Sequence, residues 1–167
     1  MTTSPEPEPA PRRPTVRDLA SPVHFLALGF GAGLAPFAPG TFGSLVGLVF
    51  ALALAPLGFG WNLAACALAV LAGIWICGES ARRLGVHDHP AIVWDEVAGM
   101  MIAMLAAPQG WWGAVLAFAL FRLFDIAKPW PIREIDHGMP GGTGIMLDDV
   151  MAGLLAAAGL LIVRYLS

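Results

Sequence analysis

The chain has 167 residues, of which 57% are hydrophobic and only 13% are charged, and its formal net charge is −3. This composition is too apolar for a small soluble domain, and it has no basic block that would suggest nucleic acid as a partner. The few charges lie beside or inside apolar stretches, where ionisable groups are costly and usually functional. The composition therefore predicts an integral membrane protein with a polar site, rather than a passive anchor.

The N-terminal region differs from the rest of the chain. Residues 1–20 alternate proline with charge, which predicts an extended or disordered tail that cannot bury a core. Residues 21–167 are expected to form one membrane-embedded domain. Its first stretch, Val23–Phe37, is apolar but interrupted by three glycines and Pro36. This pattern favours an interfacial or re-entrant segment over a full membrane span.

Beyond a turn at residues 39–44, the apolar pattern predicts an all-α, polytopic membrane bundle with about 4–5 spans. Five apolar segments follow in chain order: Leu45–Leu57, Trp61–Gly78, Val97–Ala107, Trp111–Phe124 and Val150–Leu166. Several are shorter than the roughly 20 residues that cross a bilayer, so polar ends and interfacial tryptophans are expected to complete them. Cys66 and Cys77 fall in the second segment without a CxxC motif, which indicates free, buried thiols.

The positive charges predict the topology. Arginines precede the first segment, Arg82 and Arg83 follow the second, and Lys128 follows the fourth, whereas the two hairpin turns carry no charge. Because short cytoplasmic loops are rich in Lys and Arg, the tail and both long loops are expected in the cytoplasm. Four polar segments then reach the same membrane face, where they are expected to form one site: residues 40–44, 88–96, 122–128 and 148–149.

Acidic pairs dominate these segments. Asp95–Glu96 and Asp148–Asp149 each precede an apolar run, and Asp125 lies between them in the chain. One such pair is ordinary helix capping, because acidic first turns are common. Two pairs at one membrane face, with a further aspartate, instead indicate a site for a hard cation such as Mg²⁺, which prefers oxygen ligands.

Arg122, Asp125 and Lys128 are spaced at i, i+3 and i+6 in the run RLFDIAKP. Taken alone, they could be a surface ion pair and a lysine that snorkels to the membrane edge. Next to a metal site, the two cations would instead hold phosphate oxygens.

Two weaker signals accompany these charges. The run GTFGS contains Thr41 and Ser44, and its backbone N–H groups could cradle an anion, although the spacing alone favours Ser44 as a helix N-cap. His89 lies in the loop before the third segment and could protonate a leaving oxygen at headgroup level, although loop histidines are usually only solvated.

Other chemistries have less support. GxSxG and HExxH are missing, which argues against a serine hydrolase of that type and a zinc site of that type. A small membrane transporter or channel subunit stays an alternative, because intramembrane carboxylates also mark transport pathways. The acids here, however, lie at the ends of the segments and no inverted repeat is evident.

Four runs, in this order, resemble the signature blocks of the phosphatidylglycerophosphatase A family: PVHFLALGFGAGLAPFAPGTFGSL, HDHPAIVWDEVAGMMI, FRLFDIAKPWPI and GIMLDDVMAGL. The resemblance extends from about Pro22 to the C-terminus. It implies a Mg²⁺-dependent lipid phosphatase of the bacterial inner membrane that converts phosphatidylglycerophosphate to phosphatidylglycerol and phosphate. A CDP-alcohol phosphotransferase is a further alternative, but the Asp-Gly and Ala-Arg run that opens its signature is absent.

The resemblance does not settle which carboxylate has which role, so the roles are a hypothesis built on the residues. The expected metal ligands are Asp95, Glu96, Asp125, Asp148 and Asp149, and the expected catalytic residues are Asp95, Glu96, Asp125, Asp149 and His89. Arg122, Lys128, Thr41 and Ser44 are expected to bind the phospholipid substrate at the cytoplasmic face. Direct attack by water and a covalent aspartyl-phosphate both remain open.

Overall fold

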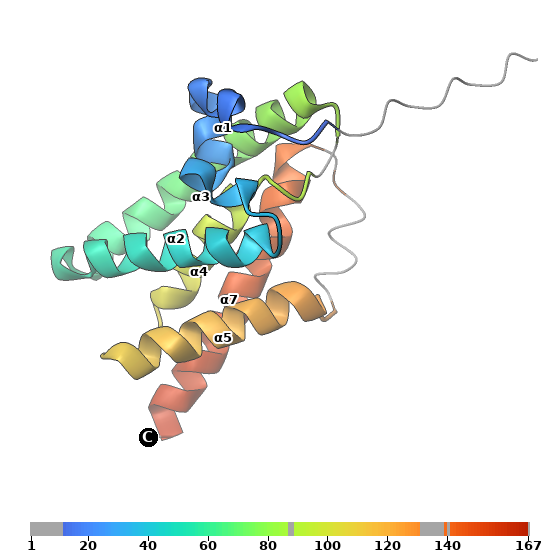
Figure 1. Ribbon diagram of the computed structural model, residues 1–167. Coiled ribbons are helices and arrows are strands. Elements are labelled where there is room, and N and C mark those ends of the chain that lie inside the picture. Colours follow the sequence, from blue (N-terminus) through green and yellow to red (C-terminus); the bar gives the residue numbers. More distant parts are fainter. Residues whose placement is uncertain (1–11, 87–88, 131–138, 140, 167) are drawn as a thin grey trace, which may run out of the picture.

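The computed structural model describes residues 12–86, 89–130, 139 and 141–166. Over these residues it is all-α, without a β-strand (Figure 1). The elements are η1 (Val16–Ala20), α1 (Pro22–Ala27), η2 (Gly29–Leu34), α2 (Pro39–Leu54), η3 (Ala55–Leu57), α3 (Phe59–Leu84), α4 (Trp94–Met104), α5 (Trp111–Ala127) and α7 (Gly142–Leu166). The predicted all-α membrane bundle is confirmed.

Among the described residues, three segments are long and apolar enough to cross a membrane: Pro39–Leu57, α3 and α7. Helix α5, with 17 residues, is slightly shorter. Helix α4 has 11 residues and therefore rises only about 16 Å, well below the thickness of the hydrocarbon core. The prediction that residues 97–107 form a span is therefore corrected.

Helix α4 is instead the centre of the bundle. Val97, Ala98, Met100 and Ala103 are completely buried, and α4 packs chiefly against α2 and α7. Its apolar composition reflects enclosure by other helices, which a hydropathy pattern cannot distinguish from exposure to lipid.

The N-terminal elements are short. Val23–Phe37 covers nearly all of α1 and the whole of η2, and left-handed backbone at Gly29, Phe30 and Gly31, inside η2, interrupts the helical path, so this segment does not span. The predicted tail is ordered in part: η1 covers residues 16–20, and Asp18 there accepts hydrogen bonds from Arg12 and from the Thr15 N–H. Residues 1–11 lie outside the described residues.

Glycines allow the helices around α4 to approach closely. A Cβ added to Gly47 of α2 would lie 2.4 Å from the Val97 carbonyl oxygen. Between α4 and α7, a Cβ on Gly99 would lie 2.7 Å from the Asp149 carbonyl oxygen, and one on Gly153 would lie 2.5 Å from that of Gly99. Small residues at such contacts are typical of helix packing in membranes, because packing rather than hydrophobic burial drives association there.

The chain alternates in direction, so polar ends gather on one side. Helices α2, α4 and α7 begin on the side of the bundle where α3 and α5 end (Figure 1). The α2–α3 and α4–α5 connections lie on the opposite side. The polar segments are thereby brought to one end of the bundle.

Candidate active site

Three carboxylates form the centre of the site. Asp95 and Glu96 lie in the first turn of α4, and Asp149 lies two turns into α7. One oxygen from each of the three lies within 4.8 Å of the others. Asp95 and Asp149 are only 7% and 4% exposed. We refer to Asp95, Glu96 and Asp149 as the acid cluster.

The acid cluster contains oxygens that the described residues do not satisfy. Glu96 Oε2 and Asp149 Oδ1 are buried and have no hydrogen-bond partner among those residues. Burying a carboxylate without a compensating partner is costly, and placing like charges side by side adds to the cost. A divalent cation would offset both costs, and this all-oxygen donor set suits a hard ion. The residues present therefore fit a metal ion.

Helix α2 contributes a glycine that the sequence analysis did not identify. A Cβ on Gly40 would lie 2.0 Å from Glu96 Oε1 and 3.3 Å from Arg122 Nη1. The backbone of α2 thus packs directly on the Glu96 carboxylate, and only glycine leaves room for it. The Gly-rich run GTFGS is the feature of the sequence that could have pointed to Gly40.

The predicted turn at residues 39–44 is instead the first part of α2, which corrects the prediction of Ser44 as an N-cap. The Ser44 hydroxyl donates to the Gly40 carbonyl oxygen at 2.8 Å, within the helix. The Thr41 N–H donates to the Ala38 carbonyl oxygen at 2.9 Å, so it is not available to cradle an anion. Thr41 lies next to Gly40 in the first turn, partly buried.

Arg122 connects α5 to α2. Its Nη1 donates to Asp125 Oδ2 at 2.5 Å and to the Ser44 Oγ at 3.3 Å. The Arg122 and Asp125 side chains are 17% and 14% exposed, so this is a shielded pair and not a surface one. Arg122 Nε is buried without a hydrogen-bond partner in the described part of the chain. Asp125 and Ser44 thus hold the guanidinium through its Nη1, and its Nε–H remains able to donate to a further acceptor.

Lys128 and Asp148 form the second ion pair, between the end of α5 and α7. Lys128 Nζ donates to Asp148 Oδ2 at 2.7 Å, and Asp148 Oδ1 accepts a hydrogen bond from the Asp149 N–H at 3.0 Å. Both carboxylate oxygens of Asp148 therefore accept hydrogen bonds from the protein. The two neighbouring acids of α7 thus have different partners: Asp148 pairs with Lys128, whereas Asp149 faces Asp95 and Glu96 in the acid cluster.

Asp148 and Asp149 do not lie at a helix start. Helix α7 begins at Gly142, before the predicted Val150, so both acids lie inside the helix and are buried. The helix-capping explanation therefore does not apply to this pair.

His89 lies apart from these contacts, in the loop before α4. It is 7% exposed, and its Nδ1 accepts a hydrogen bond from the Ala91 N–H at 3.0 Å. It lines a cavity of about 650 Å³ together with Arg13, Gly33 and Pro39. We call this space the His89 cavity.

The predicted convergence of polar segments is thus seen in the contacts. Gly40 and Ser44 meet Glu96 and Arg122, and α4 and α7 meet through the acid cluster. Cys66 and Cys77 are free and buried, as predicted.

Comparisons with known proteins show the family of the chain. The model of the family described as phosphatidylglycerophosphatase A matches residues 25–164. The chain belongs to this family. It is 44% identical to phosphatidylglycerophosphatase A of Escherichia coli (strain K12) over 140 residues, which cover 83% of this chain and 81% of the relative. It is 46% identical to the protein of that name from Haemophilus influenzae over 149 residues, covering 88% and 91%.

A third relative, from Bacteroides thetaiotaomicron, is provisionally named a phosphatidylinositol-3-phosphatase and is 38% identical over 148 residues, covering 84% of this chain and 92% of the relative. The search of solved structures returns no match. Membership of the phosphatidylglycerophosphatase A family confirms both the resemblance and the prediction of an enzyme, a phosphoric monoester hydrolase.

Proposed function

We propose that this protein hydrolyses the terminal phosphomonoester of phosphatidylglycerophosphate, giving phosphatidylglycerol and phosphate, with Mg²⁺ held by the acid cluster. The acid cluster is the observation that carries the proposal: two buried carboxylates and one half-buried carboxylate converge within 4.8 Å, and the cations Arg122 and Lys128 are held by ion pairs in the same part of the bundle. A phosphomonoester needs both kinds of group, because its own charge must be neutralised before an oxygen nucleophile can approach.

Asp95, Glu96 and Asp149 would hold the ion. Mg²⁺ bound there supplies Lewis-acid chemistry, polarising a phosphoryl oxygen and making water more acidic. Asp125 and Asp148, which were also predicted as ligands, pair with Arg122 and Lys128 instead. We assign them the role of positioning these two cations.

Arg122 and Lys128 would bind the phosphate oxygens. Arg122 is oriented by Asp125 and Ser44 and keeps its Nε–H for an acceptor, and charge-assisted contacts of this kind strengthen as charge develops on the leaving oxygen. In the reaction, the oxygen of water bonds to phosphorus and the bond from phosphorus to the glycerol oxygen breaks. The proton lost by water balances the one gained by the glycerol oxygen.

His89 suits hydrogen bonding better than proton donation. Because its Nδ1 accepts from the Ala91 N–H, its proton lies on Nε2 and the ring is neutral. An imidazolium would place a hydrogen on Nδ1, against that N–H. We therefore propose that His89, with Thr41 at the start of α2, contacts the lipid headgroup.

The proposed location is the bacterial inner membrane with the site at the cytoplasmic face. Arg82 and Arg83 end α3 and Lys128 follows α5, on the side where α4 and α7 begin, and the α4–α5 turn on the other side is uncharged. Cysteine labelling of intact cells tests this, in a background without Cys66 and Cys77. Gln109→Cys should react with an impermeant reagent from outside, and Arg82→Cys only after the membrane is opened. The reverse pattern would place the site on the outer face.

Phosphate release from purified, detergent-solubilised protein tests the activity. Phosphatidylglycerophosphate should be hydrolysed with Mg²⁺, and EDTA should stop the reaction until Mg²⁺ is restored. Phosphatidylinositol 3-phosphate, suggested by the name of the third relative, is the comparison substrate. Preference for it, or turnover in EDTA, would contradict the proposal.

A further inference from the structure

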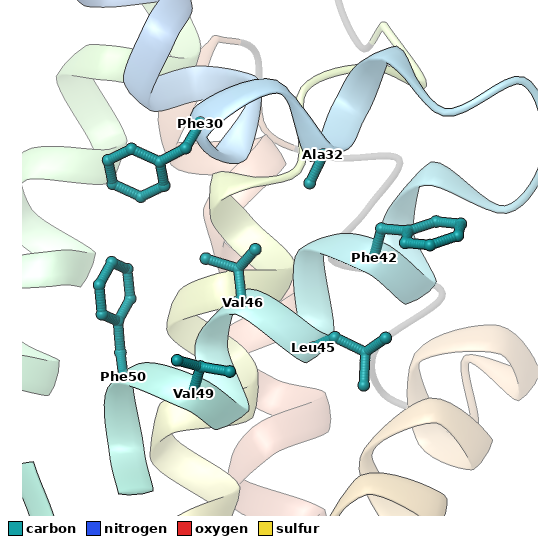
Figure 2. A pocket seen from close by; sticks show the side chains of 7 residues that line it. All are labelled: Phe30, Ala32, Phe42, Leu45, Val46, Val49 and Phe50. Atoms are coloured by element: carbon teal, nitrogen blue, oxygen red, sulfur yellow. The ribbon is translucent and has the colours of Figure 1, made fainter. Parts of the chain in front are cut away.

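A second concave surface lies between η2 and α2. Seven residues from η2 and α2 line a groove of about 510 Å³: Phe30, Ala32, Phe42, Leu45, Val46, Val49 and Phe50. Figure 2 shows Phe30 and Phe50 at one end, Phe42 toward the other, and Val46 between them. We call this surface the aromatic groove. Its residues on α2 follow the i, i+3, i+4, i+7 pattern of one helix face.

The wall of the groove is held in a costly backbone conformation. Phe30 has a φ of 60°, in the left-handed region that bulky residues rarely adopt. Its ring contacts Phe25, Phe50 and Trp94, with centroid separations of 5.1, 5.5 and 6.1 Å. These contacts hold the Phe30 ring in place along one side of the groove. The groove therefore has a defined shape and is not only a row of side chains that face lipid.

Residues that line the groove are close neighbours in η2 and α2 of residues that line the His89 cavity. Ala32 lines the groove and the next residue, Gly33, lines the cavity. On α2, Pro39 lines the cavity and Phe42 lines the groove, one helical turn further on. The cavity carries Arg13 and His89, whereas the groove has only apolar side chains. We call the boundary between η2 and α2, which both spaces share, the seam. Its lining thus changes from basic at the His89 cavity to apolar at the aromatic groove.

We propose that the aromatic groove binds one acyl chain of the phospholipid substrate, with the headgroup passing the His89 cavity and its terminal phosphate at the acid cluster; this rests on the proposed function. A molecule with an anionic headgroup and a hydrocarbon tail matches the change in character along the seam. The groove runs from Phe42 to Phe50, about 12 Å along α2 at the helical rise per residue. Pro39 lines the His89 cavity, and the next residue, Gly40, abuts the Glu96 carboxylate, so the first turn of α2 borders both the cavity and the acid cluster.

Kinetics with two chain lengths test the proposal. Val46→Phe fills the middle of the groove, about 10 Å along α2 from Pro39 of the His89 cavity, which is farther than a six-carbon chain bound from the cavity end extends. For long-chain phosphatidylglycerophosphate, KM should rise about three- to tenfold, the modest effect expected when packing contacts with a chain are lost and lipid replaces them. The kcat for that substrate and both constants for the dihexanoyl analogue should match those of the wild type.

Leu52→Phe is the matched control, because Leu52 is on α2, is 50% exposed and does not line the groove. It should leave both substrates unaffected. Unchanged long-chain kinetics for Val46→Phe, or an equal loss with both substrates, would overturn the groove proposal. If the wild type releases phosphate from neither substrate, the proposed function fails instead.

The unmodified protein provides a second measurement that does not depend on a variant folding. A phosphatidylglycerophosphate with a photoreactive group in one acyl chain should label residues 42–50, and excess substrate should compete whereas phosphatidylcholine should not. Labelling spread over the lipid-facing surfaces of α2, α3 and α7, without competition, would mean that bulk lipid covers the groove. A crosslinked dimer joined through residues 42–50 would mean that a second copy covers it. Either result would overturn the proposal.

Discussion

The acid cluster and the two ion pairs use the same residue types but differ in their neighbours. In the acid cluster, carboxylates face one another, and Glu96 Oε2 and Asp149 Oδ1 lack a hydrogen-bond donor among the described residues. In the ion pairs, Asp125 and Asp148 each accept from a cation at 2.5 and 2.7 Å. The comparison teaches that an acid's partners, and not its identity, indicate its role: unsatisfied acids await a cation, and paired acids position one.

The largest expected effect comes from Asp149→Asn in the acid cluster. Loss of one ligand charge should lower kcat/KM about a thousandfold or more, because the electrostatic stabilisation of the transferred phosphoryl group depends on the bound ion. Phosphate release measures this effect. The melting temperature gives a second readout: Mg²⁺ should raise that of the wild type and not that of the variant.

Asp18→Asn is the control, because Asp18 pairs with Arg12 near the N-terminus, away from the acid cluster. It should keep wild-type activity. If Asp149→Asn retains full turnover, the acid cluster is not the metal site.

Gly40→Ala tests whether α2 must touch the Glu96 carboxylate. A Cβ there would lie 2.0 Å from Glu96 Oε1, so either the carboxylate or the helix must move. Displacements of about 1 Å in a catalytic group cost on the order of a hundredfold in rate. Gly60→Ala is the matched control, since nothing lies within 4 Å of its added Cβ. Equal activity of the two variants would show that the contact has no catalytic role.

Arg122→Lys distinguishes phosphate binding from simple anchoring at the membrane edge. Lysine keeps the charge but cannot reproduce the planar fork, so kcat/KM should fall about ten- to a hundredfold. Expression and membrane insertion should be unchanged. Arg82→Lys, at an exposed arginine paired with Glu79, should be silent. Wild-type kinetics for Arg122→Lys would return this residue to the role of an anchor.

Asp148→Asn is expected to have the smallest effect and tests the comparison most directly. If Asp148 only positions Lys128, the variant should raise KM about three- to tenfold, in keeping with a partly exposed ion pair, and retain stabilisation by Mg²⁺. The double variant Asp148→Asn, Lys128→Gln should have a KM close to that of Lys128→Gln alone, because the effects of substitutions at contacting residues are not additive. A loss as large as that of Asp149→Asn would make Asp148 a metal ligand.

Much of the site could be predicted from residue order. The acidic pairs, the Arg122–Asp125 spacing and the alternation of apolar segments predicted one polar end, and the contacts of Ser44, Arg122 and Glu96 are found there. The length of α4 was predicted less well. Its residues are as apolar as a span, but burial within protein and exposure to lipid leave the same composition.

The division of roles between Asp148 and Asp149 could not be predicted. Adjacent residues on a helix point about 100° apart, so one must face a different neighbour from the other. Which neighbour each meets depends on how α4, α5 and α7 pack, and hence on the close approach at Gly99 and Gly153.

Composition, charge placement and motif order thus determined by themselves that this is an all-α membrane enzyme of its family with carboxylates and cations at one end. Only the tertiary structure decided which carboxylates form the acid cluster, that Gly40 contacts Glu96, and that η2 and α2 enclose a groove. The reason is physical: hydropathy and periodicity are properties of single segments, whereas partners, burial and close approach arise between segments far apart in the chain.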